Sequence, residues 1–193
     1  MKNNTFLYPL LFILLASQNI FSQTPFRIGA SFNIIFPSVN YTEFAKTGVG
    51  GTFETDYSLA PNYVIILSST YSNLTSKIPQ IGVDEKAIDF TIKSFDFLFG
   101  GRYNFNYSLF ALVKTGVSYI KLHANIYDAP SYSKDGTSTN FEPYYTIATG
   151  AGYRYNLAKD KSDFEFSAIY KFVNGDVINL NTFHLKASLL IYL

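Results

Sequence analysis

Charged side chains recur at even spacing in several segments that are otherwise apolar or small. Asp96 and Arg102, for example, are an even number of residues apart, which places them on one face of an extended strand. Interleaved acids and bases of this kind can form buried ion pairs or line a narrow ion path. The residues that we predict to form such a charge network are Glu54, Asp96, Arg102, Lys114, Arg154, Glu165, Lys171 and Lys186.

The first pairing within this network depends on where the chain turns. A tight link over 103–107 that sets Arg102 opposite Ser108 also sets Asp96 opposite Lys114, because the numbers of paired residues in an antiparallel hairpin have a constant sum. We therefore predict an ion pair between Asp96 and Lys114.

A second pairing follows from a link over 157–162, which sets Arg154 opposite Glu165. We interpret such pairs as charges that satisfy one another and fill an interior, since an unpaired buried charge is costly. The alternative interpretation is a narrow or gated path for small solutes.

The two histidines do not extend this chemistry. His184 shares the polar face of the last strand, and His123 lies in a long connection. The chain has no cysteine and no acidic cluster near either histidine, so we predict no metal site and no cofactor. Nothing orders Ser, Asp and His into a triad, so we predict no catalytic residue and a non-enzymatic protein.

The elements that must position the charges are strands, because apolar residues alternate with polar ones. In the first strand Phe26, Ile28 and Phe32 share one face, and Arg27 and Asn33 share the other. Eight strands are predicted, at about 26–36, 48–59, 63–71, 94–103, 109–119, 143–156, 164–172 and 182–193.

Two strands have an ambiguous pattern. In 63–71 we expect Tyr63 and Leu67 to point outward, although the opposite face is also apolar. Before the fourth strand the apolar residues Ile88, Phe90 and Ile92 are out of step with those that follow. We therefore predict a β-bulge near Lys93–Ser94 or the end of a membrane zone there.

The links between the strands alternate in length. Short links fall at 60–62, 103–107 and 157–162, and long ones fall near 37–47, 72–87, 122–141 and 174–181. Bacterial outer-membrane barrels have short periplasmic turns and long outer loops, so both chain ends are expected in the periplasm. The sequence therefore predicts an all-β, eight-stranded antiparallel up-and-down transmembrane β-barrel.

A soluble barrel would show the same alternation with its apolar face inward. Here the polar face combines charges with many glycines, which suit a crowded barrel interior better than a water-facing surface. These glycines are Gly29, Gly50, Gly100, Gly116, Gly150 and Gly152. Tyrosines and phenylalanines also gather near both ends of the strands, as in the aromatic belts of membrane proteins.

The remaining sequence defines the compartment. Residues 1–22 have Lys2 followed by a short apolar core from Phe6 to Ala16, which predicts a secretory signal peptide, with the barrel domain over 23–193. Removal of Lys2 leaves 14 basic and 14 acidic residues, since the whole chain has 15 Lys and Arg and 14 Asp and Glu. A neutral chain lacks the basic excess typical of nucleic-acid binding. No apolar run is long enough for a spanning helix.

With these features the chain resembles small Gram-negative outer-membrane β-barrel proteins of the OmpA/OmpX-like superfamily, including the PorT-like group. The matching stretches are FRIGASFNIIFP, GVGGTFETDYSLAPNYVIILSSTYS, SFDFLFGGRYNF, SLFALVKTGVSYI, TIATGAGYRYNL and FHLKASLLIYL. The resemblance implies location in the outer membrane after signal-dependent export, contact with outer-membrane lipid, and insertion by the barrel-assembly machinery.

For function, the sequence favours a structural or surface-binding role. The long loops carry apolar and aromatic residues that could bind an extracellular or envelope protein, because loops on a rigid scaffold commonly carry recognition. These residues are Tyr41, Phe44, Ile78, Ile81, Tyr127 and Tyr132. They could equally pack loop against loop. The alternatives are a small-solute pore and, from the resemblance to the PorT-like group alone, an accessory role in protein secretion.

Overall fold

The computed structural model describes residues 26–38, 45–75, 87–128, 133–138, 141–158, 161–174 and 180–193. The predicted signal peptide, residues 1–22, lies outside them. Strands account for most of the described part of the chain. They are β1 (Phe26–Pro37), β2 (Gly48–Ala60), β3 (Tyr63–Thr75), β4 (Ala87–Asn104), β5 (Leu109–Asp128), β6 (Ser133–Ser138), β7 (Glu142–Ala158), β8 (Ser162–Asn174) and β9 (Thr182–Tyr192).

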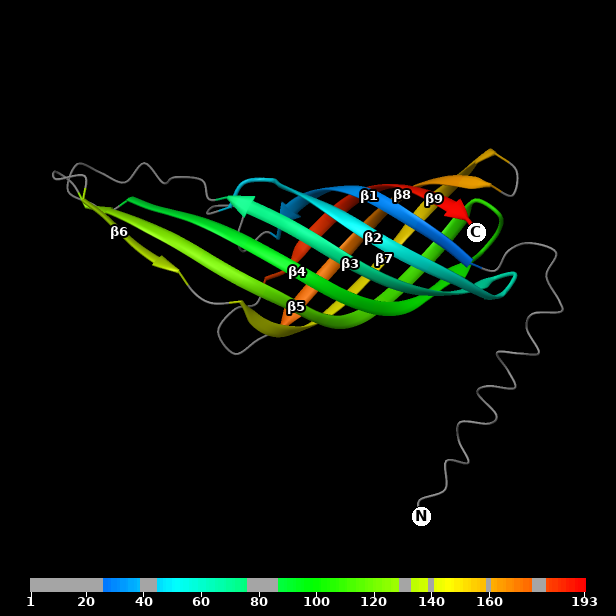
Figure 1. Cartoon of the computed structure of the whole chain (residues 1–193), viewed down its shortest axis with the longest axis horizontal. Coiled ribbons are helices and arrows are strands. Elements are labelled where there is room, and N and C mark those ends of the chain that lie inside the picture. Colours follow the sequence, from blue (N-terminus) through cyan, green and yellow to red (C-terminus); the bar gives the residue numbers. More distant parts are fainter. Residues whose placement is uncertain are drawn as a thin grey trace, which may run out of the picture.

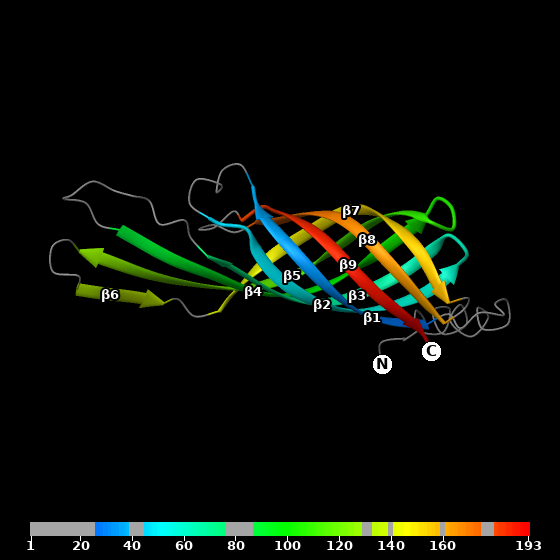
Figure 2. The same ribbon diagram turned by 90° about the horizontal axis from the view of Figure 1, so that it is seen from above.

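Eight of these strands form a closed barrel. Each strand pairs antiparallel with its neighbours in the order β4-β3-β2-β1-β9-β8-β7-β5, and pairing of β4 with β5 closes the ring. Strand β6 lies outside the ring and pairs only with the end of β5 among the described strands. Figures 1 and 2 show the resulting cylinder, with β4, β5 and β6 extending beyond one end of it. The predicted eight-stranded antiparallel fold is confirmed.

The alternation of side chains sets the two faces of the barrel wall. On β4, Phe97 is 50% exposed and points outward, whereas the next residue, Leu98, is 4% exposed and points inward. The phase expected for β3 is also confirmed, since Tyr63 and Leu67 are exposed and Val64 is buried. The charged face therefore lines the interior, as a membrane barrel requires and an apolar-cored soluble barrel does not.

Of the two alternatives that the sequence offered for β4, a bulge or the end of a membrane zone, the bulge is excluded. No bulge occurs near Lys93–Ser94, because the register with both neighbouring strands is unbroken there. Ile92 is instead buried inside the barrel, in phase with Ser94 and Asp96. The change of pattern on β4 reflects an interior that becomes apolar toward one end.

The predicted register of β4 with β5 is wrong, because each β4 residue pairs with the β5 residue four positions further along the chain than predicted. Asp96 lies opposite Ser118, and Lys114 lies opposite Gly100. The turn occupies 105–108, where the Asn106 side chain accepts hydrogen bonds from the backbone amides of Ser108 (2.8 Å) and Leu109 (2.7 Å). This side-chain cap moves the centre of the turn two residues along the chain.

Short and long connections separate as predicted. The connections that follow Ala60, Asn104 and Ala158 begin at the end of the barrel where Phe26 and Leu193 lie, which we call the short-turn end. The strand ends that border the longer connections lie at the opposite end, which we call the long-loop end. The segment near 122–141, predicted as a loop, differs because β5 continues to Asp128 and pairs with β6.

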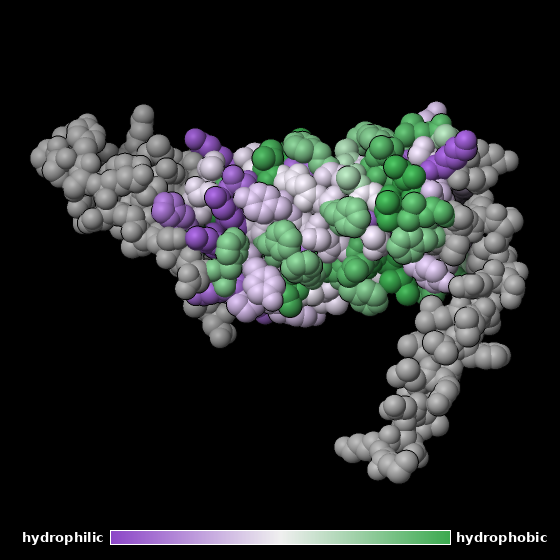
Figure 3. Space-filling model, in the orientation of Figure 1, coloured by the Kyte–Doolittle hydropathy of each residue, from purple (hydrophilic) through white to green (hydrophobic). Residues whose placement is uncertain are grey.

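The outer wall carries the apolar and aromatic side chains. Figure 3 shows hydrophobic residues over the barrel wall and hydrophilic ones gathering toward the end from which β6 projects. The ring centres of Tyr63 and Tyr103 are 5.1 Å apart in an edge-on contact near the short-turn end. Those of Phe97 and Tyr119 are 6.5 Å apart in a similar contact toward the other end. Among the described residues, no helix is long and apolar enough to cross a membrane.

Candidate functional site

Charged side chains occupy the interior along most of its length. Eleven charged residues in the described part of the chain are at most 8% exposed, and all lie on inward-facing positions of barrel strands. They are Arg27, Glu54, Asp56, Asp96, Arg102, Lys114, Arg154, Asp163, Glu165, Lys171 and Lys186. Each of them has an oppositely charged partner, and together they form three groups along the barrel.

The group nearest the short-turn end contains three arginines and three carboxylates. We call it the arginine–carboxylate cluster, and its members are Arg27, Asp56, Arg102, Arg154, Asp163 and Glu165. Arg27 contacts Asp56 at 2.7 Å and Asp163 at 2.9 Å. Glu165 lies 2.8 Å from both Arg102 and Arg154. The charges of the cluster balance, which compensates for removing them from water.

Aromatic rings support this cluster. The guanidinium carbon of Arg102 lies 4.4 Å from the centre of the Phe110 ring, and that of Arg27 lies 5.5 Å from the Tyr192 ring. The Tyr192 hydroxyl also donates a 2.6 Å hydrogen bond to Asp163. Because cation–π contacts and charge-assisted hydrogen bonds are directional, they fix the side-chain positions as well as balancing charge.

The middle group is centred on Glu54, on β2. One carboxylate oxygen, Oε2, accepts hydrogen bonds from Lys186 (2.7 Å) and Lys114 (3.4 Å). The other oxygen, Oε1, lies 3.4 Å from Arg102. Glu54 therefore joins the arginine–carboxylate cluster to two lysines from opposite walls of the barrel.

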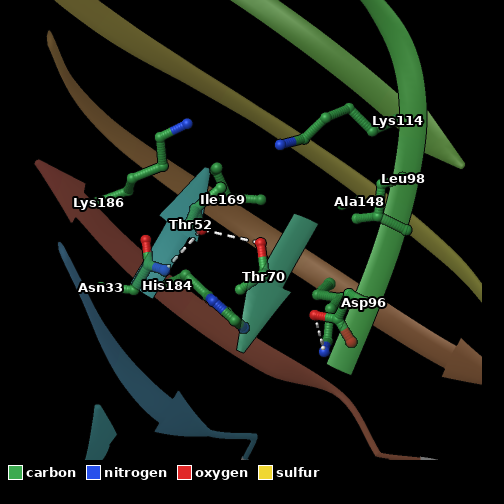
Figure 4. A pocket seen from close by; sticks show the side chains of 11 residues that line it. Asn33, Thr52, Thr70, Asp96, Leu98, Lys114, Ala148, Ile169, His184 and Lys186 are labelled. Carbon is green, nitrogen blue, oxygen red and sulfur yellow. Dashed lines mark hydrogen bonds and ion pairs between the residues drawn. The ribbon is translucent and has the colours of Figure 1, made fainter. Parts of the chain in front are cut away.

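The third group lies toward the long-loop end. Lys171 donates a 2.9 Å hydrogen bond to Asp96, and His184 shares a 2.8 Å hydrogen bond with Thr182. A cavity of about 20 Å³ lies between this group and the two lysines of the middle group. Figure 4 shows side chains from both walls pointing into it. A cavity of this size has room for about one water molecule.

Apolar side chains fill much of the remaining interior. One cluster lies near the long-loop end and includes Ile35, Leu74, Ile92, Ile120 and Val173. Another lies against the wall formed by β3, β4, β5, β7 and β8 and comprises Val64, Ile66, Leu98, Phe110, Leu112, Ala148 and Ile169. These clusters and the ion pairs occupy much of the described part of the barrel interior.

The structure places all eight residues of the predicted charge network inside the barrel, but it pairs some of them differently. Arg154 lies opposite Glu165, as the sequence predicted. The predicted pair of Asp96 with Lys114 is wrong, because Asp96 pairs with Lys171 and Lys114 with Glu54.

Three further members of the network were absent from the predicted set. Arg27 lies on the polar face predicted for the first strand, and Asp56 shares the polar face of the second strand with Glu54. Asp163 falls between the predicted link over 157–162 and the predicted strand over 164–172. The signal for Asp163 was its even spacing from Glu165, which continues the inward face of β8 by one position. His123 is exposed on the outward face of β5, away from this network.

The arrangement is suited to closing a lumen. Among the described residues, no group of three or more His, Cys, Asp or Glu is placed to hold a metal ion. Each buried acid and base of the described interior has a partner of opposite charge. Their contacts join strands on opposite sides of the barrel axis, which stabilises the barrel.

A closed antiparallel barrel of eight strands, with apolar side chains outside and paired charges inside, has the fold of small outer-membrane β-barrels of the OmpA/OmpX-like kind. Neisserial surface protein A has such a structure. It is similar to this chain with a TM-score of 0.52 and 13% sequence identity, over 90% of this chain and 100% of that one.

Two other solved structures show a weaker likeness. The attachment invasion locus protein Ail of Yersinia pestis has a TM-score of 0.48 and 16% identity, over 86% of this chain and 95% of that one. OprG of Pseudomonas aeruginosa has a TM-score of 0.48 and 12% identity, over 88% and 94% of the two chains. No protein-family model matches the chain, and no curated protein sequence matches it.

Proposed function

We propose that this chain is an outer-membrane β-barrel protein of a Gram-negative bacterium, exported by a signal peptide, with a non-enzymatic structural or surface-binding role. Its short-turn end faces the periplasm, and its long-loop end faces the cell exterior. The exposed apolar wall supports the membrane location, because outward residues such as Phe53, Leu67 and Val113 are each more than half exposed. In water such a surface would promote aggregation.

The closed interior is the observation that carries the proposed role. A lumen filled by ion pairs and apolar clusters, with a cavity of about 20 Å³ between the middle and third groups, argues against the continuous aqueous path that a solute pore needs. A rigid barrel of this kind serves as a scaffold that holds its outer segments in place. Recognition then belongs to the segments beyond the membrane.

The segment that extends furthest is a ribbon formed by β4, β5 and β6, which we call the projecting ribbon. Strand β5 has 20 residues, about twice the length needed to cross a bilayer as a tilted strand. Its last residues pair with Ala87–Phe90 of β4 on one side and with Ser133–Ser138 on the other. This ribbon offers backbone edges outside the membrane to a protein partner.

The experiment is deletion of residues 126–138, which removes β6 and the end of β5. Cells that display the shortened barrel should lose attachment to host cells or matrix proteins relative to cells that display the full chain. A control deletes residues 175–179, which link β8 to β9 in the sequence. Heat-dependent gel mobility checks that both barrels fold. Unchanged attachment after deletion of 126–138 would contradict recognition by the projecting ribbon.

A further inference from the structure

Two lysines face each other on the outside of the barrel. Lys93 on β4 and Lys121 on β5 are directly paired in the antiparallel register. Lys93 is exposed and Lys121 is partly exposed, and both lie on the outward face that Phe95 and Tyr119 share. Like charges directly opposite each other on a sheet destabilise it unless an anion lies between them.

The protein supplies no such anion within its described residues. No described carboxylate lies within ion-pair distance of either lysine. The contact found for Lys121 is with the Phe141 ring, 5.9 Å from Nζ to the ring centre. Every charged side chain of the interior, by contrast, has a partner of opposite charge. The outward lysine pair is therefore available to an external anion.

The height of the pair on the wall identifies the kind of anion. Two residues closer to the barrel centre along each strand, Phe95 pairs with Tyr119 on the same outward face. Phe97 packs against both of these rings. Two residues along a strand correspond to about 7 Å. The lysines thus lie just beyond an aromatic row of the kind that marks the membrane interface, at the height of the lipid headgroups.

Neighbouring residues add polar groups to this position. Asn73 of β3 pairs with Lys93 on the side away from β5. Thr91 of β4 and His123 of β5 form the next pair on the same face, two residues further from the barrel centre along the strands. The patch thus places cations and hydrogen-bonding side chains above a ring surface that can contact an acyl chain, which matches a lipid with an anionic headgroup.

We propose that Lys93 and Lys121 bind the phosphate group of an outer-leaflet lipid headgroup, with the lipid chain lying against Phe95, Phe97 and Tyr119. This inference rests on the proposed membrane placement of the barrel. A phosphate between the two ammonium groups removes their mutual repulsion. The same headgroup anchors this wall of the barrel, from which the projecting ribbon extends.

The test is an NMR titration of isotope-labelled protein in dodecyl maltoside micelles, which contain no phosphate. Three probes are compared at low salt: dihexanoyl phosphatidic acid, dihexanoyl phosphatidylcholine and inorganic phosphate. Phosphatidic acid should shift the backbone amide signals of Lys93 and Lys121 saturably, at lower concentrations than the other two probes. Its anionic headgroup and its chains both match the patch.

Substitutions define the contribution of each lysine. Lys93→Gln should weaken the apparent affinity for phosphatidic acid about fivefold, and Lys93→Gln with Lys121→Gln about 30-fold, since each lysine near an anionic lipid surface contributes a similar increment. Lys161→Gln is the matched control, because this exposed lysine lies at the short-turn end. It should leave the titration unchanged.

Each opposing result has a distinct meaning. Wild-type affinity in the double variant would overturn the site, and inorganic phosphate binding as tightly as phosphatidic acid would overturn its assignment to a lipid. Equal binding of phosphatidylcholine would overturn the role of the anionic charge. Broadening of the Val113 methyl signals by a lipid with a nitroxide on its chain reports membrane placement separately. Broadening there without headgroup binding refutes this inference and leaves the proposed function intact.

Discussion

Arg102 contacts three carboxylates in the part of the barrel interior near the short-turn end. Its guanidinium lies 2.8 Å from Glu165, 3.2 Å from Asp56 and 3.4 Å from Glu54, and its side chain has no exposed surface. No other residue of the arginine–carboxylate cluster joins it to the Glu54 group through an ion pair found in the structure. Removal of Arg102 would leave buried acids without their shared counter-charge.

We predict that Arg102→Met lowers the free energy of unfolding by about 3–5 kcal/mol, the cost typical of breaking a buried ion pair from one side. Denaturant unfolding of the barrel in lipid vesicles measures this. Arg102→Lys should recover part of the loss, because it restores the charge without the planar fork. The exposed Lys161→Met should leave the free energy of unfolding essentially unchanged. A loss below about 1 kcal/mol in Arg102→Met would mean that the cluster is not structural.

At the scale of the strands, the close approach of β4 and β5 depends on small inward residues. An added Cβ at Gly100 would contact the backbone oxygen of Val113 and would lie 2.6 Å from the Cα of Lys114. At the adjacent Gly101, which faces outward, the nearest atom is 3.9 Å away. Both glycines lie on β4 and pair with β5, but they face opposite sides of the barrel wall.

This difference gives a matched prediction. Gly100→Ala should destabilise the barrel by about 1–3 kcal/mol, since the backbone of β5 must shift to admit the methyl group. Gly101→Ala should be neutral or slightly stabilising, because alanine reduces the freedom of the unfolded chain. Unfolding of both variants under identical conditions checks this. Equal effects at the two positions would argue against the inward phase assigned to Gly100.

Periodicity made the strands and their faces predictable, because each side chain's direction follows from its position in an alternating pattern. The register of β4 with β5 was not predictable from hydrophobicity. The Asn106 side chain determines where that turn closes, and a shift of the turn by two residues preserves the face of every residue. The ion partners of Asp96 and Lys114 changed with it.

Contacts across the barrel axis could not be predicted from the sequence either. Lys171 and Asp96 lie on β8 and β4, which are not neighbours in the sheet, so no pairing rule links them. Strand β6 was missed for a different reason. Its sequence, SKDGTS, has no apolar alternation, and its pairing with β5 provides the order.

At the scale of the whole molecule, the filled interior predicts that the barrel does not conduct ions. Planar-bilayer recordings of the purified protein should show an unbroken seal. Lys114→Ala should also remain closed, because the apolar cluster around Ile35, Leu74 and Ile120 still fills the long-loop end. Discrete conductance steps in the wild-type protein would contradict the closed lumen and favour the pore alternative.

Adjacent residues that face opposite sides of the wall allow the most direct test of the account. Val113 is 58% exposed and its neighbour Leu112 is 2% exposed, and Leu189 and Leu190 differ in the same way at 44% and 0%. With methyl-labelled protein in vesicles that contain a nitroxide on the lipid chains, the signals of Val113 and Leu189 should broaden, and those of Leu112 and Leu190 should remain sharp. A protein that folds in water without lipid or detergent, or that shows the opposite pattern of broadening, would contradict the outward placement of the apolar face.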